Sequence, residues 1–584
     1  MTLLLLLSLL SLLCCGQVEA QINPALPFRE YLDPGQLVSL SWGFDVQQDL
    51  ITFELSIGTM GWVGLGFSDN GGMAGSDIVI GGVFPNGSQY FKDRYATGNT
   101  LPLVDPQQDY TLLSLSERDG KTVMAFNRSI GACDSRDFPI TTLPIKLIYA
   151  YGLNDEITHH SGRRGTKEIS LLGYVPRSTP TTTNHFDITA NNFTVPPVHT
   201  YYYCRIIKAP NLGRKNHIYQ IEPIVDHVDL THHMLLYGCS ASVNQTLEGM
   251  CYSNNMSPFN FCFKVIAAWG IGGGSFYLPP NTGISIGGTN DPAYYRLEMH
   301  YNNPSQAQGQ VDNSGLRFHY TPELFDHDVG TLHIGLDLIP EYMLPPDTQS
   351  FRSYAVCNTS IFSKVLPGSF PDMNVFAVLL HTHLAGRKMR VAQFRNGEQI
   401  GFLGVNENYD FNLQEFKYLG QTAIIKEGDE MVVECTYNTK NRSKVTNLGL
   451  STTEEMCYAF LLYYPATDIS FCWSVPNMTQ VGASLQATNK VAAGANLMTM
   501  TWNESSVQSY QNLLHNVSQV VFVGSTVHGF AAQTGFVRDI KANPSLSCKA
   551  SSSEAGSTVS THGKAKWTQA TLLSLLLLWL AVLH

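Results

Sequence analysis

Residues 376–383 read Phe-Ala-Val-Leu-Leu-His-Thr-His, an apolar run that ends in two histidines one residue apart, and Gly386 follows closely. Such a run closed by a turn-forming residue is typical of a buried β-strand. Similar runs recur along the 584-residue chain, whereas segments with helical periodicity are scarce. This pattern predicts an all-β fold of antiparallel sandwiches. Further strands are expected at 37–44, 51–57, 62–67, 78–83, 145–151 and 431–437, and one helix at 506–516.

Changes in composition divide the chain into segments. A Ser/Thr/Pro-rich stretch lies around 177–184, and a second loosening contains Pro345 and Pro346. At roughly 100–200 residues per domain, the length suits three or four domains. We expect sandwiches at 28–175, 195–345 and 350–500, with a linker at 176–194 and a tail at 501–548.

Both ends of the chain resemble targeting segments. The leucine-rich start followed by Val18-Glu-Ala20 predicts a signal peptide at residues 1–20. Residues 549–584 hold small residues, a polar spacer and an apolar run at 570–583, in the order of a GPI signal. A single-pass anchor is the alternative for that run. We therefore expect a protein of the secretory pathway, either secreted or anchored in the membrane of the endoplasmic reticulum or cell surface.

Other features agree with that route. Cys14 and Cys15 fall in the leader, and the ten cysteines that remain of twelve form an even set suited to disulfides. The net charge of −11 comes without a basic run, which argues against nucleic acid as a partner. Asn-x-Ser/Thr sequons predict glycosylation at Asn86, Asn127, Asn192, Asn244, Asn358, Asn441, Asn477, Asn503 and Asn516.

The two histidines of the opening stretch suggest a metal site. Side chains alternate faces along a strand, so His381 and His383 point the same way and can share one ion. A methionine thioether as a third ligand would favour copper, because soft sulfur selects Cu(I) over zinc or magnesium. Met456 is a candidate, although a methionine taken alone is far more often a core residue and spacing does not assign it as a ligand. The adjacent His232 and His233 would share a site only at a bulge or a strand end.

Taken together, the motifs resemble a known family. HHMLLY begins at His232, EMHYNNP contains His300, HTHLAGR begins at His381, and EEMCYAFLLYYP contains Met456. Their order and spacing are similar to those of the copper type II ascorbate-dependent monooxygenases. Upstream, the stretches at 61–68 and 76–82 resemble a DOMON domain, which favours the dopamine β-hydroxylase-like branch. The resemblance covers nearly the whole chain and implies a DOMON sandwich followed by two jelly-roll-like copper domains.

The resemblance also implies a chemistry. It assigns an electron-transfer copper to His232, His233 and His300 in the domain at 195–345, and an oxygen-activating copper to His381, His383 and Met456 in the domain at 350–500. Ascorbate would supply electrons, and one oxygen atom of O2 would enter a C–H bond of a small-molecule substrate. The family pattern further implies the disulfides Cys133–Cys548, Cys204–Cys251, Cys239–Cys262, Cys357–Cys472 and Cys435–Cys457.

Two departures from the family pattern concern the substrate. Leu379 and Phe460 replace an arginine and a tyrosine of the peptide-amidating relatives, which argues against peptide amidation. His333 stands where dopamine β-hydroxylase has an acidic residue, so an ammonium group would lose its partner. We expect a different small aromatic or hydrophobic substrate. The alternative is a catalytically silent copper-binding surface or interaction protein, and the sequence leaves the oligomeric state open.

One more histidine pair lies in the N-terminal segment. His159 and His160 precede Ser161-Gly-Arg-Arg164, and we expect them in a polar surface loop.

Overall fold

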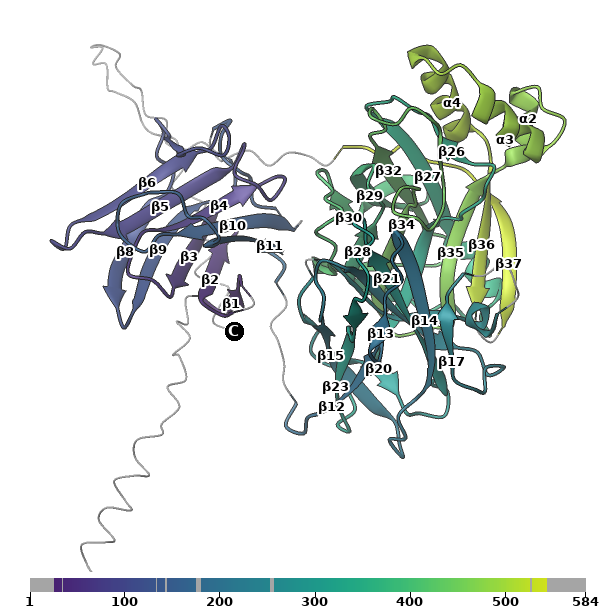
Figure 1. The fold of residues 1–584 in the computed structure, drawn as a ribbon, viewed down its shortest axis with the longest axis horizontal. Helices are drawn as coiled ribbons and strands as arrows, with labels where there is room; N and C mark the ends of the chain where they lie inside the picture. The colour runs from purple at the N-terminus through teal and green to yellow at the C-terminus, as the bar shows by residue number, and fades with distance from the viewer. Residues whose placement is uncertain are drawn as a thin grey trace, which may run out of the picture. The chain divides into compact units, whose positions relative to one another are not determined.

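The computed structural model describes residues 26–542 apart from 34, 133, 142–143, 175–179, 253–256, 272 and 526–527. Its N-terminal part is a sandwich of two antiparallel sheets (Figure 1). Strand β3 (Leu50–Ile57) shows why, since its alternate residues are fully buried and its other residues are partly exposed. One sheet has the order β1 (Phe28–Tyr31), β2 (Val38–Asp45), β3, β9 (Lys121–Ser129), β8 (Thr111–Arg118). The other has the order β11 (Arg164–Ile169), β10 (Ile145–Tyr151), β4 (Val63–Ser68), β5 (Asp77–Val83), β6 (Gln89–Tyr95), β7 (Leu103–Val104).

A second sandwich follows, with its own apolar core around Leu297, Met299 and Phe318. One sheet has the order β12 (Asn184–Thr189), β23 (Gly315–Thr321), β15 (Asn216–Ile224), β20 (Thr282–Ile286), β24 (His327–Asp328), and β19 (Phe276–Tyr277) pairs with β15. The facing sheet has the order β17 (Leu247–Met250), β14 (Thr200–Lys208), β21 (Tyr294–Asn302), β16 (Thr231–Cys239), β18 (Cys262–Gly270). A short pair joins β13 (Phe193–Thr194) to β22 (Val311–Asp312).

The third sandwich contains the largest sheet. Its order is β31 (Lys417–Ile425), β28 (Met373–His381), β34 (Tyr458–Tyr464), β25 (Gly330–Leu336), β35 (Ile469–Pro476), β36 (Gln519–Ser525), β37 (Gly529–Gly535). The facing sheet has the order β27 (Phe351–Asn358), β32 (Glu430–Tyr437), β29 (Gly386–Arg395), β30 (Glu398–Asn406). A short pair joins β26 (Met343–Leu344) to β33 (Thr446–Asn447). The third sandwich was expected at 350–500. Its largest sheet also contains β25, which lies before residue 350, and β36 and β37, which lie after residue 500.

The all-β fold class is confirmed. The predicted helix is also present, as α4 (Glu504–Asn516), which begins two residues earlier than expected because Asn503 and Ser506 form a capping box. Two further helices that we did not predict precede it, α2 (Met478–Ser484) and α3 (Lys490–Thr499), each capped by an asparagine side chain. The 3-10 turns η1 (Pro258–Phe261) and η2 (Thr359–Lys364) complete the described elements.

Among the residues that the structure describes, four disulfides lie in the two later sandwiches. Cys204–Cys251 and Cys239–Cys262 lie in the second, and Cys357–Cys472 and Cys435–Cys457 in the third. These are pairs that the resemblance implied, whereas the implied Cys133–Cys548 bridge lies outside the described residues. Disulfides of this number indicate folding in an oxidising compartment, secretory or extracellular. Among the described residues, no helix has the length and apolar character to cross a bilayer, and the predicted leader and C-terminal signal are not described.

Candidate metal centre

Three histidines meet where β16 and β21 pair. His233 lies directly opposite His300 in the ladder, and the register shifts between Thr231 and His233. That irregularity lets the adjacent His232 turn to the same side as His233, as expected only at a bulge or strand end. The Nδ1 atom of His233 lies 3.4 Å from that of His232 and 3.2 Å from that of His300. All three imidazoles are buried and offer nitrogen atoms within 4.8 Å of one another. The group could therefore hold a metal ion.

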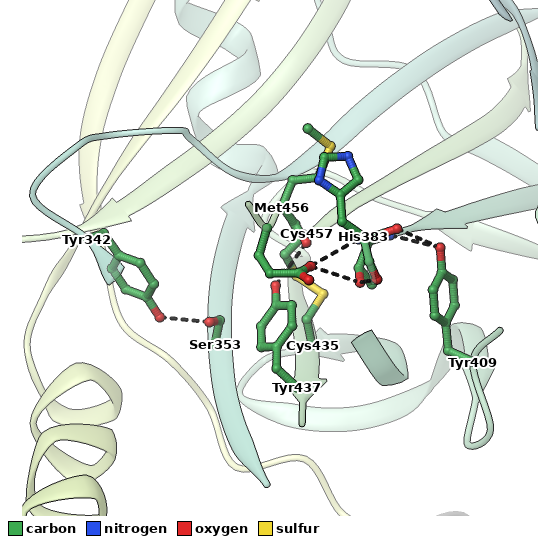
Figure 2. The surroundings of a disulfide bond; sticks show 10 residues. Tyr342, Ser353, His383, Tyr409, Cys435, Tyr437, Met456 and Cys457 are labelled. Carbon is green, nitrogen blue, oxygen red and sulfur yellow. Dashed lines mark hydrogen bonds between the residues drawn. A yellow bond between two sulfur atoms is a disulfide. The ribbon is translucent and has the colours of Figure 1, made fainter. Parts of the chain in front are cut away.

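A second group forms where β28 ends. The strand stops at His381, two residues earlier than predicted, but the chain continues so that the rings of His381 and His383 lie 5.4 Å apart. Met456 comes from the segment just before β34, and its Sδ atom lies 3.0 Å from Nε2 of His381. Cys457, the next residue, is tied to Cys435 on β32 (Figure 2). The disulfide therefore anchors the segment that carries the thioether.

Hydrogen bonds fix which nitrogen of each ring is free. Nδ1 of His381 lies 2.5 Å from the amide oxygen of Gln414, and Nδ1 of His383 lies 3.2 Å from the carbonyl oxygen of Glu454. Since both oxygens only accept, Nδ1 carries the proton in each neutral ring. Nε2 of His381 then faces the Met456 sulfur with a lone pair, and Nε2 of His383 is buried without a partner. The Nε2 lone pairs and the sulfur converge on one point, and the hydrogen bonds at Nδ1 hold the two rings in this orientation. Such an arrangement suits a metal ion between them.

The electrostatics keep these rings neutral. Burial, which disfavours charge, lowers the pKa of His381 to about 4. Burial and then repulsion from His381 lower the pKa of His232 to about 3, and burial lowers those of His233, His300 and His383 well below the usual value. Neutral imidazole is the form that binds a metal, so the group needs no deprotonation near pH 7.

The two groups are neighbours. The rings of His233 and His381 lie 5.4 Å apart, and those of His300 and His383 lie 6.4 Å apart. Phe411 stacks on His232 with 3.9 Å between the ring centroids. All six residues that the sequence singled out therefore gather in one buried region between the second and third sandwiches.

Sequence reasoning missed two supporting side chains. Glu455 accepts hydrogen bonds from the backbone N–H groups of His383 (3.0 Å) and Ala385 (2.5 Å), and burial raises its pKa to about 7. Its place beside Met456 in the EEMCY motif was an available signal. Gln414, which orients His381, lies in a loop without a motif, and no sequence signal pointed to it.

His333 and Phe460 lie beside this centre. They are cross-strand neighbours on β25 and β34, and their rings stack with 4.3 Å between centroids. Tyr458 and Trp473 meet the imidazole edge-on at 4.4 and 5.2 Å. The ring nitrogens His333 Nε2 and Trp473 Nε1 are buried without a hydrogen-bond partner. Met456 and Leu379 belong to the same apolar cluster as Phe460, which brings these aromatic rings next to the thioether.

Comparisons with known proteins agree with this geometry. Family models match at residues 34–152 (DOMON domain), 186–308 (copper type II ascorbate-dependent monooxygenase, N-terminal domain) and 327–483 (its C-terminal domain). The chain therefore belongs to the copper type II ascorbate-dependent monooxygenase family.

Within that family, several relatives are DBH-like proteins. DBH-like monooxygenase protein 2 of Mus musculus is 36% identical over 93% of this chain and 89% of its own length. DBH-like monooxygenase protein 1 of Homo sapiens is 39% identical, covering 78% of this chain and 76% of its own. Dopamine beta-hydroxylase of Bos taurus is 32% identical, covering 80% and 78%. The dopamine β-hydroxylase-like character expected from the sequence is confirmed at the level of the family.

Proposed function

We propose that this chain is a copper- and ascorbate-dependent monooxygenase that hydroxylates a C–H bond of a small aromatic or hydrophobic substrate with O2. The observation that carries the proposal is the approach of Met456 Sδ to His381 Nε2 at 3.0 Å, beside the unpartnered Nε2 of His383. Two imidazoles and a thioether form a donor set that prefers copper, especially Cu(I). The domain limits expected from the sequence, 28–175, 195–345 and 350–500, remain part of this proposal.

Each residue has a role in the proposal. His381, His383 and Met456 would hold the copper at which oxygen reacts, and His232, His233 and His300 would hold a second copper that supplies an electron. Copper, when bound, provides the redox chemistry and the activation of O2. Gln414 and the Glu454 carbonyl group hold the Nδ1 protons, so that both Nε2 lone pairs stay directed inward. The surrounding burial excludes water from the reacting centre.

The neighbouring aromatic rings support the substrate class. Phe460, Tyr458 and Trp473 would stack against a flat or apolar molecule, and Leu379 offers no charge for a peptide carboxylate. Burial and then repulsion from His381 lower the pKa of His333 to about 3, so this side chain is neutral and cannot pair with an ammonium group. Its free nitrogen suits a neutral hydrogen-bonding group instead.

Processing in the secretory pathway completes the proposal. We infer cleavage after Ala20, glycosylation at the nine sequons and either secretion or attachment through residues 549–584, by a GPI signal or a single-pass anchor. A shift in mass on endoglycosidase treatment of the protein from mammalian cells tests the glycosylation. Release from cells by a phosphatidylinositol-specific phospholipase tests the GPI alternative.

The decisive experiment supplies copper-loaded protein with ascorbate and 18O2 and screens a library of small aromatic and apolar compounds for label. We expect label in a product of the parent, none with His381→Ala, and full label with His528→Ala, which removes an exposed histidine far along the chain. Dopamine belongs in the same screen, and turnover of dopamine as the preferred substrate would contradict the proposed substrate class. Binding of copper without any labelled product would favour the alternative, a catalytically silent copper-binding protein. The histidine at position 333 is the sequence feature that points to this alternative.

A further inference from the structure

Basic residues are in the minority in this chain, with 36 lysines and arginines against 47 aspartates and glutamates. Some segments nevertheless concentrate them, among them the one with Arg163 and Arg164 and the one at 440–444. Near the first, His160 was expected in a polar surface loop but is buried, which corrects that prediction, whereas His159 is exposed. The second reads Lys-Asn-Arg-Ser-Lys, and its first three residues line a cavity together with residues that follow the H-x-H pair.

This cavity measures about 400 Å³ and lies against the turn between the H-x-H pair and β29. Leu384, Ala385 and Arg387 form one wall, and residues 438 and 440–442 form the other. The two walls are held together, because the backbone N–H of Asn438 donates to the carbonyl group of Ala385 at 2.8 Å. Pockets for organic ligands measure about 300–1,000 Å³. The volume therefore suits a small organic molecule better than a single inorganic ion.

The lining carries charge of one sign, from Arg387, Lys440 and Arg442. Among the described residues, no aspartate or glutamate is part of the lining. Two carboxylates pair with these cations from outside it, since Lys440 lies 3.0 Å from Asp347 and Arg442 lies 3.4 Å from Glu455. A cleft lined by one sign of charge raises the local concentration of ions of the opposite sign. The lining therefore favours an anion.

The guanidinium group of Arg387 is held at the edge of the cavity. Its Nη1 atom donates to the carbonyl oxygen of Leu384 at 2.8 Å and to that of Gly386 at 2.6 Å. The group cannot turn away without breaking these two hydrogen bonds. Its positive charge is therefore in place before a ligand arrives, which lowers the cost of ordering it on binding.

The cavity also lies next to a proposed metal ligand. Leu384, on one wall, directly follows His383 in the chain. Arg442, on the other wall, contacts Glu455, whose carboxylate accepts the backbone N–H of His383 at 3.0 Å. A molecule in the cavity would thus contact residues that are joined to His383 by one peptide bond or by two hydrogen bonds. An electron donor bound there would lie close to the group that holds the metal.

We propose that this cavity is the docking site of ascorbate, which enters as an anion and lies between Arg387 and Lys440. The inference rests on the proposed monooxygenase function, in which ascorbate supplies the electrons. In each event one ascorbate monoanion gives one electron to the metal group and its remaining enediol proton to water, and the ascorbyl radical anion departs. The proposed substrate site around His333 and Phe460 consists of aromatic rings, so reductant and substrate have separate sites.

The test is equilibrium dialysis of 14C-labelled ascorbate against the full secreted chain, in the absence of copper and oxygen so that the ligand is not oxidised. We expect saturable binding with one site per chain, weakened by added salt because salt screens exposed charges. L-Gulono-1,4-lactone, an uncharged analogue with the same lactone ring, should not compete at an excess of about tenfold. Binding that never saturates, or that the lactone displaces as well as ascorbate does, would overturn the proposal. Displacement by an equal concentration of inorganic phosphate would show a general anion site instead.

Substitutions then test the two walls. Lys440→Gln should weaken ascorbate binding about fivefold through the loss of one charge. Lys426→Gln is the matched control, because Lys426 is also an exposed lysine paired with an exposed aspartate, and it should leave binding unchanged. Arg387→Gln should weaken binding about tenfold, whereas Arg387→Lys, which keeps the charge, should stay within about threefold of the parent. Equal losses with the two lysine variants, or with the two Arg387 variants, would contradict the assignment.

Asn441, which also lines the cavity, is one of the predicted glycosylation sites. The dialysis is therefore carried out before and after endoglycosidase treatment, and binding is expected in both forms. Binding seen only after treatment would exclude the site in the secreted protein. Because dialysis needs no turnover, its outcome is separate from the screen for labelled product. Labelled product from the parent, together with unchanged ascorbate binding in Lys440→Gln, would refute this site and leave the monooxygenase proposal intact.

Discussion

The carboxylate of Glu455 accepts the backbone N–H of His383 at 3.0 Å, across a sequence separation of 72 residues. Its second oxygen accepts the N–H of Ala385 at 2.5 Å, and Arg442 lies 3.4 Å from the same oxygen. One buried side chain therefore joins the turn that follows the H-x-H pair to the segment that bears Met456. The relative position of imidazole and sulfur depends on this link.

The first prediction concerns that link. Glu455→Gln replaces one accepting oxygen by an NH2 group, which would face a backbone N–H donor. We expect copper affinity at the His381/His383/Met456 group to fall about 10- to 100-fold, as for losses of groups that orient metal ligands. Equilibrium dialysis with a competing chelator measures this. Glu454→Gln is the control, because that carboxylate accepts the N–H of Ser451 instead, and it should leave affinity unchanged.

The second prediction concerns the thioether. Met456→Leu conserves volume, so the fold should survive at a cost below about 1.5 kcal/mol. We expect bound copper to fall from two ions per chain to one, and labelled product to disappear, since leucine offers no lone pair. Met389→Leu, at a buried methionine of the same sandwich, should retain both. Two tightly bound coppers in the Met456→Leu protein would rule out the sulfur as a ligand.

The third prediction concerns pH in the copper-free protein. The folded-state pKa of His381 is about 4, below the ordinary 6.5, so between those values the unfolded chain binds the extra proton. Stability from this residue is therefore present at pH 7 and is lost as pH falls below 6.5, by about 2 kcal/mol at pH 5. The His381→Gln variant does not lose this stability at low pH, because glutamine does not titrate. The stability of the variant relative to the parent, measured by urea unfolding, should rise from pH 7 to pH 5, and a constant difference would contradict the neutral buried imidazole.

The fourth prediction compares two disulfides of similar span. Cys435–Cys457 closes a separation of 22 residues beside Met456, and Cys239–Cys262 closes one of 23 in the second sandwich. Replacing either pair by alanine should cost about 2–4 kcal/mol of unfolding free energy. Only loss of Cys435–Cys457 should lower copper occupancy at the methionine-containing group, because of these two disulfides only Cys435–Cys457 anchors the segment that carries Met456. Equal copper losses in both double variants would show a general effect of destabilisation.

The fifth prediction concerns substrate charge. His333→Glu places a carboxylate against Phe460, Tyr458 and Trp473. We expect it to raise kcat/KM for an aromatic amine relative to its uncharged analogue about tenfold, through a charge-assisted hydrogen bond. The ratio of labelled products from an equimolar mixture measures this preference. An unchanged ratio would place position 333 outside the substrate site.

Much of this protein followed from local sequence. Short apolar runs broken by turn-forming residues predicted the sandwiches, and the alternation of side chains in an extended chain predicted that His381 and His383 point to one side. Both predictions depend only on neighbouring residues. The motifs likewise named the other ligand candidates. Tertiary structure alone brought Met456 to His381 over 75 residues, turned His232 beside His233 by a register shift, and set Gln414 and Glu455 behind the rings. Strand register and loop position arise from packing between distant segments, and no short stretch of sequence contains that information.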